Sequence, residues 1–103
     1  MPRIRDIAKA CKSKNAGPFE LTIDVVFDDP ALFRRVRSTG VICPALFARI
    51  YNVAEAEVIF TEYPAGNAFK ATVPRRIGAG DVGDTDVYGA QQHAPLLEVE
   101  IPI

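Results

Sequence analysis

The segment 19–27 alternates between apolar and polar side chains, and this pattern constrains the fold more than any other feature of the chain. Apolar residues occupy every second position from Phe19 to Phe27, with Glu20, Thr22 and Asp24 between them. Successive side chains of a β-strand point to opposite faces, so this period is typical of a strand that is buried on one face only. The segment therefore predicts a strand whose apolar face is covered by another layer.

Two further runs rich in β-forming residues, 57–63 and 68–73, follow later in the chain. They are separated by residues 64–67, Pro-Ala-Gly-Asn, which have the composition of a short hairpin loop. We expect these two runs to pair as antiparallel strands.

Two short helices are expected between the first strand and this hairpin. Asp29 followed by Pro30 supplies a capping carboxylate and a proline in the first helical turn, which predicts a helix that ends near Gly40. Pro44 repeats the proline start and predicts a second helix that ends near Asn52.

The two ends of the chain complete the expected fold. Residues 4–11 fit either a helix or an edge strand, 12–18 contain turn-forming Asn, Gly and Pro, and 97–103 alternate as a final strand does. This βαββαβ order predicts an α+β fold: a ferredoxin-like two-layer sandwich with an antiparallel sheet and a shortened second helix.

Composition limits the classes of function. A chain of 103 residues with 49% hydrophobic residues fits a single domain, 1–103. The formal net charge of -1 disfavours nucleic acid as a partner, and the absence of a long apolar run disfavours a membrane. We expect a cytoplasmic protein whose two cysteines, Cys11 and Cys43, are buried or half-buried free thiols.

The segment 84–93 concentrates hydrogen-bonding side chains just before the expected final strand. Its polar residues include Asp84, Asp86, Tyr88, Gln91, Gln92 and His93, which is the only histidine. A buried polar group without a partner costs about 1 to 3 kcal/mol, so a segment that only builds the core does not need so many. We expect this segment to contact something other than its own fold.

His93 has two interpretations. An imidazole has an ordinary pKa near about 6.5, which suits a general acid or base at neutral pH, with Tyr88 or Asp86 as its helper. Alternatively, His93 hydrogen-bonds the backbone and orders the connector. Tyr88, Gln91 and Gln92 are recognition groups, with a buried network or a subunit contact as the alternative.

A metal site is not expected. Asp84 and Asp86 with His93 offer suitable ligand types, but in a helix Asp86 and His93 would lie two turns, about 10 Å, apart. A helix N-cap and an acidic first turn explain both carboxylates. No cofactor-binding loop is evident either, so we expect no cofactor.

A second candidate patch lies in the segment 12–17. Lys12, Lys14, Asn15 and Gly17 offer two ammonium groups and loop amides that would hold a carboxylate or phosphate, while a solvated turn is the alternative. The sharper hypothesis is that this patch meets the segment 84–93 to bind an organic acid or CoA ester.

Two longer phrases carry a family resemblance. Residues 13–22, Ser-Lys-Asn-Ala-Gly-Pro-Phe-Glu-Leu-Thr, and 84–97, Asp-Thr-Asp-Val-Tyr-Gly-Ala-Gln-Gln-His-Ala-Pro-Leu-Leu, resemble the domain-of-unknown-function 4387 family. The resemblance implies a small bacterial protein, encoded beside a larger acyclic terpene utilisation A-like protein among genes of carboxylic-acid and acyl-CoA catabolism. It also implies a likeness to the C-terminal small domain of that larger protein.

Three functions fit these observations. The first is an accessory or regulatory subunit that docks on the larger acyclic terpene utilisation A-like protein and contributes a polar ligand-binding segment. The second is a self-contained hydratase, isomerase or lyase that uses His93. The third is a homo-oligomeric module that binds a metabolite. We favour the first, because 103 residues leave little room for a closed pocket and no nucleophile-base set is evident.

Overall fold

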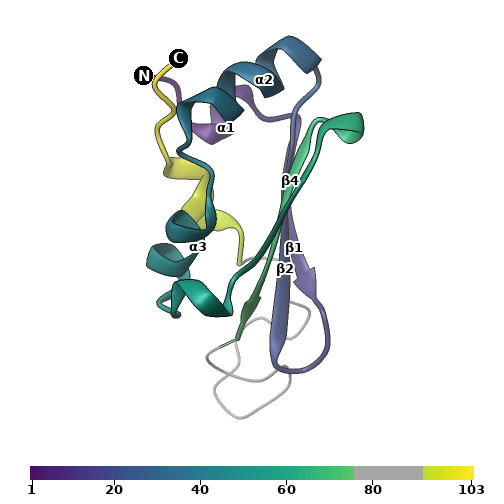
Figure 1. Ribbon diagram of the computed structural model, residues 1–103, viewed down its shortest axis with the longest axis vertical. Coiled ribbons are helices and arrows are strands. Elements are labelled where there is room, and N and C mark those ends of the chain that lie inside the picture. The colour runs from purple at the N-terminus through teal and green to yellow at the C-terminus, as the bar shows by residue number, and fades with distance from the viewer. Residues whose placement is uncertain (76–91) are drawn as a thin grey trace.

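The computed structural model describes residues 1–75 and 92–103 and contains a four-stranded antiparallel sheet. Figure 1 shows helices α2 (Pro30–Thr39) and α3 (Pro44–Tyr51) and the 3-10 helix η3 (Ala94–Glu98) together on one side of this sheet. The structure is therefore the two-layer α+β sandwich that the sequence predicts. No helix within these described ranges is long and apolar enough to cross a membrane.

Two hairpins build the sheet. The strands are β1 (Ala10–Asn15), β2 (Glu20–Val26), β3 (Ile59–Tyr63) and β4 (Ala68–Pro74). Their order across the sheet is β1-β2-β4-β3, so each hairpin contributes one inner and one outer strand. The hairpins join where β2 pairs with β4, with Ile23 opposite Ala71. The predicted pairing of the runs 57–63 and 68–73 is confirmed.

The alternation in β2 buries its apolar face as expected. Leu21, Ile23 and Val25 are at most 2% exposed, and they face the helical layer. Phe19 departs from the prediction, because it lies in the turn before the strand begins and is 63% exposed. The apolar face of β2 therefore starts at Leu21.

Both α-helices after β2 begin and end where the sequence predicts. The Asp29 carboxylate accepts a hydrogen bond from the backbone N–H of Ala31 at 2.9 Å, which satisfies a donor that the first turn leaves free. At the other end of α2, Gly40 adopts a φ of 70°, the left-handed conformation that glycine adopts at low cost. Helix α3 ends at Asn52, whose φ is 55°.

Aromatic rings connect the two layers. Phe33 of α2 packs on Phe69 of β4 with ring centroids 4.9 Å apart. Phe47 of α3 lies 5.9 Å from Phe60 of β3, which in turn lies 6.2 Å from Phe69. The rings of both α-helices thus meet on the inner face of the β3–β4 hairpin.

The chain ends differ from the sequence-based prediction. Residues 4–11 form both of the elements considered, the helix α1 (Ile4–Ile7) and the start of β1. Most of the expected loop 12–18 is strand, because β1 continues to Asn15. The expected final strand 97–103 is wrong: η3 covers its start, and the pairing that follows is an isolated bridge between Arg3 and Glu100. The element order in the described ranges is therefore not βαββαβ, although the sandwich is retained.

Candidate functional site

The structure describes two members of the polar segment, Gln92 and His93, immediately before η3. The predicted site residues Asp84, Asp86, Tyr88 and Gln91 lie outside the described residues. The geometry of the candidate site therefore starts from His93.

Two hydrogen-bonding contacts join His93 to Ser13 on β1. The backbone N–H of His93 donates to Ser13 Oγ at 3.1 Å, and Ser13 Oγ lies 3.4 Å from Nδ1 of the imidazole ring. Ser13 is only 6% exposed, whereas His93 is half-buried. The contacts place the imidazole against the inner face of the outer strand β1.

The roles of donor and acceptor in the side-chain contact between Ser13 and His93 depend on the tautomer of the ring. If neutral His93 carries its proton on Nε2, Nδ1 accepts from the Ser13 hydroxyl; if the proton is on Nδ1, the ring donates to Ser13 Oγ. Among the described residues, Nε2 has no hydrogen-bond partner. In the Nε2–H tautomer the imidazole offers an N–H donor to a carbonyl or carboxylate oxygen, whereas in the Nδ1–H tautomer Nε2 keeps the lone pair that a general base needs.

Tyr51 of α3 fixes the residue before His93. Its hydroxyl donates a hydrogen bond to the carbonyl oxygen of Gln92 at 2.8 Å. Burial, and to a smaller extent the nearby Cys11, raises the pKa of Tyr51 well above its ordinary value. Tyr51 therefore remains a hydrogen-bond donor throughout the physiological pH range.

Asn15 extends the site along the same face of β1. Arg75, at the end of β4, donates from Nη1 to the side-chain oxygen of Asn15 at 2.6 Å, and its backbone N–H donates to the Phe19 carbonyl at 2.8 Å. Residues two apart in a strand point the same way, so Asn15 and Ser13 share one face. The imidazole and the guanidinium group thus contact neighbouring inner-face positions of β1.

The other three residues of the expected patch lie elsewhere. Lys12 and Lys14 are exposed and lie on the opposite face of β1 from Ser13 and Asn15. Gly17 lies in the turn after the strand with a φ of 98°. Of the patch, the structure brings Asn15 to the same face as the Ser13–His93 contact but brings neither lysine there.

Cys11 completes the inner face of β1. Its thiol is free and half-buried, as is that of Cys43, which confirms the expectation for both. Burial, with a further contribution from Asp24, raises the pKa of Cys11 to about 11, so the thiol is protonated at neutral pH and is a poor nucleophile. The described part of the chain contains no group of three His, Cys, Asp or Glu side chains placed to hold a metal ion.

We call these residues the His93 cluster: Cys11, Ser13, Asn15, Tyr51, Arg75, Gln92 and His93. Four of them, Cys11, Ser13, Tyr51 and Arg75, were not predicted as site residues. The alternation of Cys11, Ser13 and Asn15 was the available signal, but turn-forming residues that follow it favoured a loop. Tyr51 could not be found from the sequence, because its contact with Gln92 joins positions far apart in the chain.

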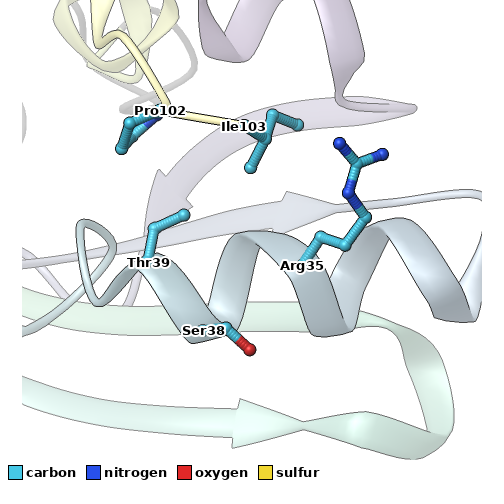
Figure 2. Close-up of a pocket in the computed structure, with 5 residues that line it drawn as sticks. All are labelled: Arg35, Ser38, Thr39, Pro102 and Ile103. Atoms are coloured by element: carbon cyan, nitrogen blue, oxygen red, sulfur yellow. The ribbon is translucent and has the colours of Figure 1, made fainter.

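A separate groove of about 460 Å³ lies between α2 and the last residues of the chain. Figure 2 shows Arg35 and Thr39 directed toward Pro102 and Ile103, whereas Ser38 points away from them. The Thr39 hydroxyl already donates to the Val36 carbonyl at 2.6 Å. The groove shares no residue with the His93 cluster, and we assign no ligand to it.

Comparison with known proteins gives a family and nothing more specific. The model of the family described as domain of unknown function (DUF4387) matches residues 4–100 of the chain. The chain itself has no significant match among the curated proteins or the solved structures. The matched residues span both hairpins, both α-helices and the His93 cluster. The chain therefore belongs to the DUF4387 family.

Proposed function

We propose that this chain is a small accessory subunit of a larger acyclic terpene utilisation A-like protein in carboxylic-acid and acyl-CoA catabolism. Its contribution is a ligand contact centred on His93. The observation that carries the proposal is the pair of contacts with Ser13, which orients the imidazole and leaves Nε2 without a partner among the described residues.

The chemistry of this contact fits an oxygen acceptor on the ligand. In this proposal neutral His93 is the Nε2–H tautomer, whose ring N–H would donate to a carboxylate or a thioester carbonyl, the acceptors that organic acids and CoA esters present. Ser13 is a poor candidate for the nucleophile of a self-contained enzyme, because its side chain is buried and its oxygen accepts from the His93 backbone. The geometry thus supports ligand contact more than autonomous catalysis.

The position of the His93 cluster supports a role beside a larger partner. Strand β1 is an outer strand of the described sheet, so Ser13 and Asn15 lie at an edge of that sheet, with the Ser13 side chain itself buried. A second protein that packs along this edge would lie next to His93. The identity of that protein comes from the family resemblance.

Co-expression tests both parts of the proposal. The tagged larger protein should co-purify with this chain, and the complex should bind butyrate or butyryl-CoA more tightly in isothermal titration calorimetry than either part alone. Failure to form a complex would remove the accessory role.

Single variants in the complex test the site. His93→Gln keeps a similar size and loses the imidazole, so binding of these two probes should weaken by about tenfold, as expected for the loss of one hydrogen bond of about 1.4 kcal/mol. Lys14→Gln is the matched control, since Lys14 lies on the opposite face of β1, and it should leave binding unchanged. If complex formation is normal but His93→Gln binds as the native chain does, the site assignment is wrong and the subunit role stands.

A further inference from the structure

Among the strands that the structure describes, β3 has an unpaired hydrogen-bonding edge. It lies at the end of the described sheet opposite β1 and pairs there only with β4. Its backbone groups that face away from β4 have no partner among the described residues. An unpaired edge of this kind is a template for the addition of another strand.

Strand β3 also lacks two of the usual features that block such an addition, lysine and proline. The other outer strand, β1, carries the exposed lysines Lys12 and Lys14, whereas the range Ile59–Tyr63 contains neither lysine nor proline. Its one charged side chain, Glu62, points toward the helical layer, where its carboxylate lies 3.2 Å from Nε of Arg37. Within the described part of the chain the edge is therefore open, and its one inward-pointing charge is paired.

The sequence of β3 is complementary to itself. Ile59, Thr61 and Tyr63 share the face of the sheet that no helix covers, and Ile59 and Tyr63 are 63% and 47% exposed. Antiparallel pairing with a second copy about Thr61 would place each Ile59 opposite the Tyr63 of the other copy, and the two Thr61 side chains opposite each other. Aromatic with β-branched residues, and threonine with threonine, are favourable cross-strand pairs.

The charges near this edge are also complementary in the same register. Glu62 of each copy would lie opposite Phe60 of the other, close to the twofold axis. Each Glu62 is already paired with Arg37 of its own copy. These two pairs balance each other and avoid the cost of juxtaposed like charges at the axis. The ammonium group of Lys70, which lies 5.7 Å from the centroid of the Tyr63 ring, adds one positive charge per copy on the uncovered face, one strand further from the axis.

We propose that β3 is the interface between two copies of this chain, paired antiparallel about a twofold axis through Thr61. The two sheets then form one continuous sheet, and the two β1 strands lie at its outer ends. The proposal does not depend on the proposed function, and it leaves the His93 cluster accessible to a larger partner. A strand of five residues buries little area, so we expect a weak dimer, with a dissociation constant of roughly 10 to 100 μM.

The test compares two double variants that remove the same apolar side chains. Ile59→Glu with Tyr63→Lys places opposite charges across the axis, whereas Ile59→Lys with Tyr63→Lys places like charges there. Sedimentation equilibrium over roughly 5 to 500 μM should show a dimer for the native chain and for the first variant. The second variant should associate at least about tenfold more weakly than the first.

Circular dichroism of both variants shows whether each folds. If neither variant folds, the single variant Thr61→Lys replaces them. It places two lysines opposite each other across the axis, so it should dimerise more weakly than the native chain. A native chain that stays monomeric over this range overturns the proposal, as does equal association of the two charged variants. The proposal is also overturned if the native chain is a monomer that binds the larger protein and the double-lysine variant does not. That result would instead assign β3 to the contact with the larger protein.

Discussion

Ser13 is the residue on which the geometry of the His93 cluster depends. Ser13→Ala removes the acceptor for the His93 backbone N–H and the contact with Nδ1, so the free energy of unfolding should fall by about 1 to 3 kcal/mol. In ¹⁵N NMR of the imidazole, the native chain should show the Nε2–H tautomer, and the variant should show a mixture. Ser38→Ala removes an exposed hydroxyl from α2 and should change neither measurement appreciably.

Cys11 makes the stability of the fold sensitive to alkaline pH. Its pKa is about 11 in the folded protein, against an ordinary value of 9.0, so the folded chain holds the thiol proton more tightly than the unfolded chain does. The resulting stabilisation is complete below pH 9.0 and is lost as the pH rises to about 11.

Urea unfolding at a series of pH values measures this dependence. The free energy of unfolding of the native chain should decline between pH 9.0 and about 11, and Cys11→Ala should make the decline shallower. Cys43→Ala, which removes the other half-buried thiol, should keep the decline, because Cys11 is still present. An unchanged slope in Cys11→Ala would contradict this account.

At the scale of single elements, the end of α2 depends on one glycine. Gly40 has a φ of 70° with no atom near the position of an added Cβ, so Gly40→Ala should cost about 1 kcal/mol through the backbone alone. Gly66 also has open space but not a left-handed φ, and Gly66→Ala should therefore stay within about 0.5 kcal/mol of the native chain. Thermal or urea unfolding compares the two variants, and equal losses would refute the argument.

The elements that the sequence predicts correctly are those with local signals. Alternation in β2, the Asp29 and Pro30 start of α2 and the turn residues between β3 and β4 all act within a few positions of one another. The segment 97–103 shows the limit of such signals. Its alternation resembles that of a strand. In the structure, however, the fully buried Leu96 anchors η3 in the core, and among the described residues the segment after η3 forms only the isolated bridge between Arg3 and Glu100.

The candidate site was less accessible to prediction than the fold. His93 and Asn15 belong to the two polar segments that the sequence singles out, and the structure places both on the inner side of β1. Their partners, Ser13 and Tyr51, are ordinary residues in the sequence and gain a role only through contacts between distant segments. No local pattern encodes such contacts.

At the scale of the whole molecule, the two chain ends close one end of the core. Ile101 donates its backbone N–H to the Pro2 carbonyl at 2.8 Å, and Ile4 donates to the Val99 carbonyl at 2.9 Å. Ile4 and Ile101 are both fully buried, and Figure 1 shows the N- and C-terminal segments side by side. The C-terminal residues are therefore part of the core and not an appendage.

Truncation of Ile101 measures this contribution. Ile101→Ala should lower the free energy of unfolding by about 2 to 5 kcal/mol, because it leaves a cavity among buried apolar side chains. Ile103→Ala, two residues further on and only half-buried, is the matched control and should cost clearly less. Similar losses in urea unfolding would show that the last residues act as a unit without specific packing.

The strand order also determines the sequence of events during folding. Short turns connect β1 to β2 and β3 to β4. Strands β2 and β4, in contrast, are separated in the chain by α2, α3 and β3. We expect the pairing of β2 with β4 to limit the refolding rate, because distant segments pay the entropy of loop closure before their contacts form. Ala71 lies on β4 opposite Ile23 of β2, so in stopped-flow experiments Ala71→Gly should slow refolding. Thr61→Ala, on the outer strand β3, should mainly accelerate unfolding.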